Sequence, residues 1–284
     1  MNFLLNLSEK EIIELNSELN NFAMPPIRDG YILPEDCFDA IEKGAYDGID
    51  ILIGTNADEM RYWIQECGYY FLFKILLKIE VENITLFRIK KDGLNYLKRF
   101  KQIVRENPEE NFLSDLIFRS PALKIAEMHS KKNNNVYLYY WTWPSSLPNF
   151  GACHAVELSY VFNNLHETHY MGDKNINYKL GQIVQDMWAN FAKNGDPSTK
   201  EYLWKKFELK NYYCMTLGKT IELVDNRKIF PKERNDVMEP LVYQYIPYDY
   251  NSLSFNVPTT KKILGVLISI FVLLLGMIFK YIFN

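Results

Sequence analysis

Two short apolar runs place the strongest constraint on what this chain can fold into. Residues 49–53 lie between two glycines, and residues 136–143 form an aromatic run that ends at Pro144. A short apolar run between turn residues is typical of a strand buried on both faces, as in a parallel sheet. Segments with helical spacing alternate with these runs, which predicts an α/β sheet rather than a sandwich or a bundle. Gly54 is predicted to end the first strand.

Three segments carry the spacing and end signals of helices. Residues 8–20 begin with a capping box, and residues 120–132 have a proline in the first turn. Residues 181–194 repeat apolar side chains at intervals of three and four, and Gly195 is predicted to form the C-cap. A β-hairpin is predicted within residues 212–223.

The composition bounds the class of protein and its partners. The 284 residues are 48% hydrophobic, enough to bury a sizeable core in one or two domains. The 32 basic and 35 acidic residues give a net charge of −3 without strong segregation along the chain. No phosphate-tracking surface is therefore implied, and nucleic acid is not an expected partner.

No metal or cofactor is expected. His166 and His169 have H-x-x-H spacing without a third ligand, so a surface pair is favoured over a metal site. The cysteines form no C-x-x-C pair, which favours free thiols over zinc or dithiol chemistry. Two disulfides in an oxidising compartment stay open as the alternative; the four positions are Cys37, Cys67, Cys153 and Cys214.

The carboxy-terminal end carries a long apolar run. Residues 263–279 contain no charge, and if Lys280 reaches the interface the run extends to Phe283. Such a helix is roughly 31 Å long, which spans a hydrocarbon core. A buried core helix is the alternative, but the run is apolar on every face. We expect a linker at 251–262 and a single-pass membrane helix at 263–283, with the side of the membrane left open.

One histidine and one glutamate are placed where a site would assemble. His154 lies in a small-residue loop after the second strand run, and Glu59 follows the first. A histidine acts as a general base when a carboxylate fixes its tautomer, and the order acid then histidine is that of α/β-hydrolases. From the residues alone, a plain loop histidine and an exposed acidic pair remain the alternative. The aromatic stretch 61–82 could line a substrate site, but a core role is favoured.

Several motifs together resemble the type B carboxylesterases, the family of cholinesterases, lipases and para-nitrobenzyl esterases. They occur in family order, and the resemblance extends over about residues 5–245; the motifs are residues 29–34, 54–59, 115–121, 151–162 and 187–197. The resemblance implies the carboxy-terminal part of an α/β-hydrolase fold in residues 1–250. It also implies that Glu59 is the acid and His154 the base of a catalytic triad. The family usually has glycine where this chain has Met60, which bears on the loop carrying Glu59.

The third member of that triad is missing from the sequence. The family's nucleophile is a serine in a G-x-S-x-G elbow in the amino-terminal half, and no serine of this chain lies in that pattern. A Glu–His pair alone could at most activate water. We therefore expect a serine-esterase fragment that acts on a carboxylic ester once complemented by a half carrying the serine. The alternatives are a non-catalytic, membrane-anchored binding or adhesion module and an inactive remnant.

Overall fold

The computed structural model describes residues 6–18, 29–34, 36–66, 77–78, 81–82, 85, 89, 92–132, 134–166, 171–172, 174 and 176–244. Two compact units divide the chain: Asp36–Ile246, and Met1–Glu35 together with Pro247–Asn284. The smaller unit contains α2 (Glu9–Glu18), which begins at the predicted capping box. There the Ser8 N–H donates to Glu11 Oε2 at 2.8 Å, and the Glu11 N–H donates to Ser8 Oγ at 3.3 Å.

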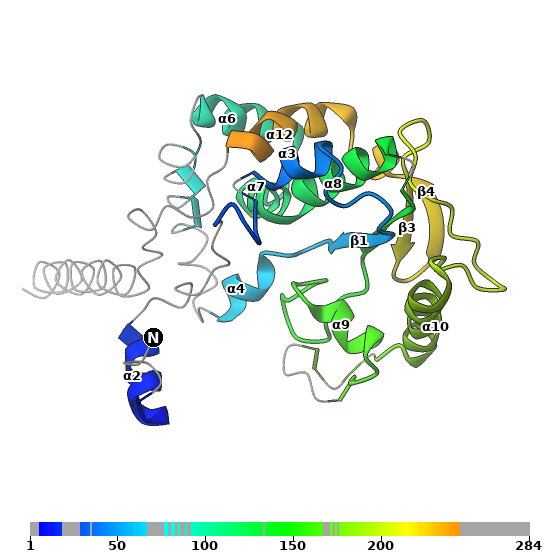
Figure 1. Ribbon diagram of the computed structural model, residues 1–284, viewed down its shortest axis with the longest axis horizontal. Helices are drawn as coiled ribbons and strands as arrows, with labels where there is room; N and C mark the ends of the chain where they lie inside the picture. Colours follow the sequence, from blue (N-terminus) through cyan, green and yellow to red (C-terminus); the bar gives the residue numbers. More distant parts are fainter. Residues whose placement is uncertain are drawn as a thin grey trace, which may run out of the picture. The chain divides into compact units, whose positions relative to one another are not determined.

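The larger unit is built on a four-stranded sheet, which confirms the predicted α/β class (Figure 1). Its strands lie in chain order: β1 (Ile51–Asn56), β2 (Val136–Trp141), β3 (Tyr213–Leu217) and β4 (Ile221–Asp225). The β1–β2 and β2–β3 pairs are parallel, and β3–β4 is the predicted antiparallel hairpin.

The prediction that Gly54 ends the first strand is wrong. Gly54 lies inside β1 and pairs with Tyr139 of β2. A Cβ atom at this position would stand 2.3 Å from Cγ of Tyr139, so the glycine is required because that aromatic ring packs against the backbone. The strand therefore continues to Asn56, and the loop that carries Glu59 begins three residues later than a stop at Ile53 would place it.

Helices cover both faces of the sheet. One apolar cluster joins side chains of β2 and β3 to α9 and α10, and a second joins β2 and β3 to α8. A third cluster forms among helices, chiefly α6, α7, η1 and α12. The bounds are α3 (Cys37–Glu42), α4 (Arg61–Glu66), α6 (Gly93–Ile103), α7 (Pro108–Ser114), the π-helix η1 (Asp115–Arg119), α8 (Ser120–Lys131), α9 (Val156–Val161), α10 (Tyr178–Asn194), α11 (Asn226–Ile229) and α12 (Lys232–Gln244).

The predicted helix at 181–194 is α10, and both of its ends follow local chemistry. It begins earlier than predicted because the Asn177 side chain caps the Leu180 N–H at 3.0 Å. It ends at Asn194, where Gly195 has φ +69°, so the predicted glycine C-cap is confirmed.

The described cysteines are free thiols. Cys153 and Cys214 are buried and Cys37 is partly exposed, while Cys67 lies outside the described residues. Burial raises the pKa of both buried thiols to about 12, so neither is a thiolate nucleophile at neutral pH.

Within the described ranges, no helix is long and apolar enough to cross a membrane. The span expected at 263–283 and the linker at 251–262 both lie outside the described residues.

A buried ion cluster joins η1 to α12. Asp115 is 1% exposed, and its carboxylate accepts two hydrogen bonds of 2.7 Å from Arg119 and two of 2.7 and 2.9 Å from Arg234. Burial alone would raise the pKa of Asp115, but the two guanidinium groups outweigh it and hold this pKa below its usual value. The charge of Asp115 is thus fully satisfied, and the register of η1 against α12 depends on it.

Replacing Asp115 by Asn should destabilise the protein by about 3–5 kcal/mol, because two buried guanidinium groups lose their counter-charge. Thermal unfolding of the full chain, followed by circular dichroism, measures the loss. The matched control is Asp236→Asn, which breaks an exposed ion pair with Lys232 and should cost about 0–1 kcal/mol. Equal losses in the two variants would contradict the role given to the cluster.

Candidate active site

The ends of β1 and β2 set the position of the candidate site. The last residue of β1, Asn56, pairs with the last residue of β2, Trp141. Loops that follow neighbouring parallel strands leave from the same edge of the sheet, where ligand sites of α/β proteins assemble. The turn after β1 carries Glu59, and the longer loop after β2 carries His154.

The two side chains singled out in the sequence meet at this edge. Nδ1 of His154 lies 2.7 Å from Oε2 of Glu59, although 95 positions separate them in the chain. The Glu59 side chain is 6% exposed and that of His154 is 39% exposed. The carboxylate is therefore enclosed, while the imidazole remains open to a reaction partner.

The second oxygen of Glu59 fixes how the carboxylate is oriented. Oε1 accepts the backbone N–H of Asn56 at 2.8 Å, which leaves Oε2 for the imidazole. An ionised carboxylate can only accept, so Nδ1 of His154 must carry the proton and Nε2 is the free acceptor. A histidine in this tautomer can take a proton from a hydroxyl group.

Two aromatic side chains enclose the imidazole. The ring centroid of His154 lies 4.8 Å from that of Trp63 and 4.9 Å from that of Phe118. Trp63 and Phe118 also stack on each other, at 5.9 Å and an interplanar angle of 19°. Trp63 comes from α4, directly after the Glu59 turn, and Phe118 comes from η1. These contacts limit the rotation of the histidine and form an apolar wall beside it.

A second, partly buried carboxylate extends the polar network. The Nδ2 group of Asn56 donates to the carbonyl of Cys153 at 2.8 Å and also to Oε2 of Glu157. Burial raises the pKa of Glu157, the hydrogen bond from Asn56 opposes this shift, and Glu59 adds to it. Burial, Glu157 and Glu59 together hold the pKa of Tyr139 well above its usual value. Asn56 thus bonds to Glu59 through its backbone N–H, and through its side-chain amide to Glu157 and to the loop that carries His154.

Most of these partners were not predicted from the sequence. Trp63 lies in the aromatic stretch for which a core role and a substrate-lining role were both open, and it packs on a core cluster as well as on His154. Glu157 follows His154 by three positions, and Asn56 precedes Glu59 by three. The signal available in the sequence was that each of these two polar residues lies three positions from a predicted site residue. Phe118 lies within the family motif 115–121, but that motif did not place it beside His154.

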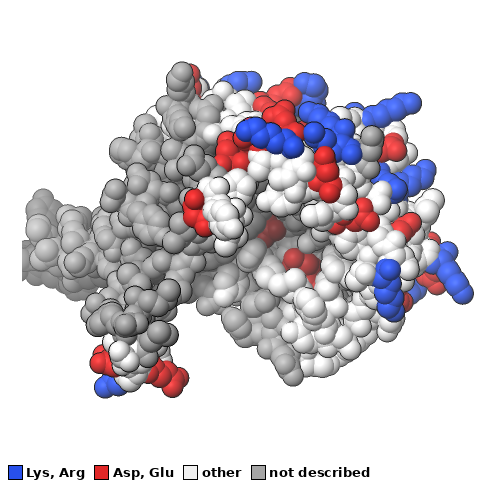
Figure 2. All heavy atoms as spheres, in the orientation of Figure 1, with Lys and Arg blue, Asp and Glu red and all other residues white. Residues whose placement is uncertain are grey.

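The remaining polar candidates are placed away from this network. His166 is exposed and lies 3.1 Å from the hydroxyl of Tyr178, while His169 is outside the described residues. On the face shown in Figure 2, lysine and arginine side chains are interspersed with acidic ones rather than gathered in a patch of one sign.

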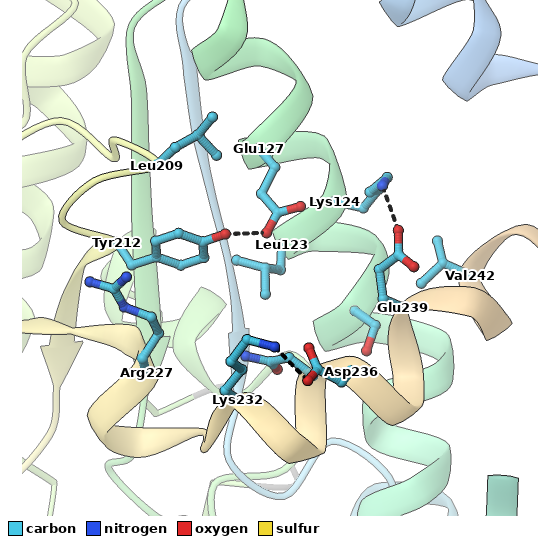
Figure 3. A pocket seen from close by; sticks show the side chains of 12 residues that line it. Leu123, Lys124, Glu127, Leu209, Tyr212, Arg227, Lys232, Asp236, Glu239 and Val242 are labelled. Carbon is cyan, nitrogen blue, oxygen red and sulfur yellow. Dashed lines mark hydrogen bonds and ion pairs between the residues drawn. The ribbon is translucent and has the colours of Figure 1, made fainter.

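A cavity of about 360 Å³ lies elsewhere, between α8, α11 and α12 (Figure 3). Neither Glu59 nor His154 lines it. The polar groups that line it pair with one another or with a neighbour: Lys124 with Glu239 at 2.9 Å, Lys232 with Asp236 at 2.6 Å, Tyr212 with Glu127 at 2.7 Å, and Arg227 with Asp225 outside the lining at 2.6 Å. The cavity is therefore not the candidate catalytic centre.

Comparison with known proteins identifies the family of the chain. The model of the carboxylesterase family matches residues 1–234, and the chain belongs to that family. The chain is 27% identical over 241 residues to the para-nitrobenzyl esterase of Bacillus subtilis (strain 168), a match that covers 81% of this chain and 46% of that protein. It is 24% identical over 225 residues to acetylcholinesterase 1 of Caenorhabditis elegans, a match that covers 65% of this chain and 34% of that protein. It is 24% identical over 263 residues to neuroligin-2 of Rattus norvegicus, a match that covers 77% of this chain and 31% of that protein.

Solved structures show the same fold. A carboxylesterase of Geobacillus stearothermophilus superposes with a TM-score of 0.67 at 20% identity, covering 83% of this chain and 50% of that one. A PNB esterase superposes with a TM-score of 0.62 at 23% identity, covering 86% of this chain and 50% of that one. The chain thus has the α/β-hydrolase-like fold of carboxylesterases, and it spans half or less of the length of each of these relatives.

Glu59→Gln should reverse the tautomer of His154. The Asn56 N–H requires an acceptor, so the glutamine will turn its amide oxygen there and its NH₂ group toward the imidazole. Nδ1 must then accept, and the proton moves to Nε2. Ring ¹⁵N chemical shifts of histidine-labelled protein measure the change, with the exposed His166 as an internal control. A His154 that keeps its Nδ1 proton in the variant would show that Glu59 does not set the tautomer.

Proposed function

We propose that this chain supplies the acid and the base of a serine carboxylesterase, with the nucleophile provided by residues outside these 284. One observation carries the proposal: the 2.7 Å contact between His154 Nδ1 and Glu59 Oε2, in a chain of the carboxylesterase family. The tautomer that this contact favours leaves Nε2 free to act as a base.

The reaction follows from that geometry. As a serine hydroxyl attacks the ester carbonyl, Nε2 of His154 takes its proton, and Glu59 stabilises the imidazolium that forms. The imidazolium then gives the proton to the departing alkoxide, which leaves as the alcohol. Water attacks the acyl-serine in the same way and releases the carboxylic acid. No serine of these 284 residues lies in a G-x-S-x-G elbow, so the attacking serine is proposed to come from outside the chain.

Carboxylic esters are the proposed substrates. The names of two relatives, a para-nitrobenzyl esterase and an acetylcholinesterase, support this class. The apolar wall that Trp63 and Phe118 form beside His154 would suit an ester with a hydrophobic portion next to the reacting carbonyl.

We further propose that residues 1–250 form the esterase portion and that residues 263–283 anchor it to a membrane through the linker 251–262. The support is the uncharged run from 263 to 279. The full chain should stay in the membrane pellet after a carbonate wash, and a chain ending at residue 262 should not. Release of the full chain by carbonate would contradict the anchor.

In a polypeptide that joins this chain to an amino-terminal half with a G-x-S-x-G elbow, His154→Ala should lower the rate of p-nitrophenyl butyrate hydrolysis at least about 10³-fold. Glu59→Gln should lower kcat by about 10⁴-fold, because it holds His154 in the wrong tautomer. His166→Ala is the matched control, because this histidine is exposed and lies outside the network, and it should keep the parent rate.

Equal hydrolysis by the parent and the His154→Ala variant would show that the base is wrongly assigned. If no G-x-S-x-G elbow is encoded upstream and the chain hydrolyses no ester, the non-catalytic binding or adhesion module becomes the better account. The absence of the elbow from these 284 residues is the observation that favours this second candidate.

A further inference from the structure

Asp58 is the neighbour of Glu59, and the proposed reaction gives it no role. It bonds twice to the loop that carries His154. The Asp58 N–H donates to the carbonyl of Ala152 at 2.9 Å, and the Ala152 N–H donates to Oδ2 of Asp58 at 2.8 Å. Ala152 is 1% exposed, so the second bond joins a carboxylate to a buried amide. Such charge-assisted bonds are stronger than neutral ones.

The loop approaches Asp58 so closely that only glycine fits before Ala152. Gly151 has φ +59°, and a Cβ atom there would lie 2.3 Å from Oδ2 of Asp58 and 2.6 Å from Nη1 of Arg61. After His154, Ala155 also has a left-handed backbone, with φ +62°. A non-glycine residue in this region costs about 1 kcal/mol or more and persists only where its surroundings determine it. The loop is therefore held in one shape on both sides of His154.

The second carboxylate oxygen of Asp58 contacts Arg61. Oδ1 of Asp58 lies 3.1 Å from Nη2 of Arg61, and Nε of Arg61 lies 2.7 Å from Oε1 of Glu110. Glu110 belongs to α7 and its side chain is 7% exposed. The chain of contacts runs from α7 through Arg61 and Asp58 to the backbone two residues before His154. It fixes the distance between the two loops independently of the Glu59–His154 bond.

We propose that Asp58 is a positioning residue for His154. Two consecutive residues bond to the same loop at two points: Asp58 to the backbone of Ala152, and Glu59 to the imidazole of His154. The first bond sets where the imidazole stands, and the second sets its tautomer. This inference rests on the proposed function, since it assigns Asp58 a task in the same acid–base pair.

Asp58→Asn tests the proposal, because the amide has the size of the carboxylate but presents an NH₂ group to one of its two donors. Deuterium exchange of the peptide covering 150–155 should become about tenfold faster or more, the effect expected from losing one charge-assisted bond. The ring ¹⁵N signals of His154 should move toward a mixture of tautomers. In the polypeptide that contains the nucleophile, kcat should fall by about 10²-fold with KM within about twofold of the parent.

Asp39→Asn is the matched control, because it removes an exposed carboxylate of α3 that pairs with Lys43. It should leave the exchange rate, the His154 signals and kcat at their parent values. A folded Asp58→Asn protein with parent exchange and parent His154 signals would overturn the positioning role, whatever the activity. If the parent hydrolyses no ester, the proposed function fails by itself, and the exchange and ¹⁵N measurements still decide the role of Asp58.

Discussion

The parallel pairing of β1 with β2 determines where every part of the candidate site lies. The two strands pair in register over their full length, from Ile51 with Val136 to Asn56 with Trp141. They end at the same level, and the turn with Glu59 therefore faces the loop with His154. Gly54 permits this register, because any larger residue would collide with the ring of Tyr139. A shift by one residue would reverse the faces of β1 and separate the carboxylate from the imidazole.

Buried charges connect this strand edge to the helices around it. The Asp115 cluster holds η1 against α12. The same π-helix presents Phe118 to the imidazole of His154. Asp58, Arg61 and Glu110 connect the Glu59 turn to α7. The imidazole is thus held by a carboxylate, by two aromatic rings and by the backbone of its own loop, each contributed by a different part of the fold. This redundancy is the arrangement expected of a residue that must keep one orientation during proton transfer.

Local patterns in the sequence predicted the features that depend on local chemistry. Strand runs, the glycine after α10 and the capping box before α2 follow from neighbouring residues, and the family motifs pointed to Glu59 and His154. Contacts set by tertiary packing were not predictable in this way. A glycine after an apolar run can mark the end of a strand or a place where a neighbouring side chain packs against the backbone. The end of β1 was therefore wrongly predicted at Gly54. The partners Phe118 and Arg234 depend on how distant helices pack, and periodicity carries no information about that packing.

We propose that Glu59 and His154 serve a serine that lies outside these residues. The most direct measurement treats the longest natural polypeptide containing this chain with a fluorophosphonate probe, which reacts with activated serines, and maps the modified peptide by mass spectrometry. We expect modification at the serine of a G-x-S-x-G elbow outside Met1–Asn284. Modification at a serine within Met1–Asn284, or no modification of a folded polypeptide, would contradict it.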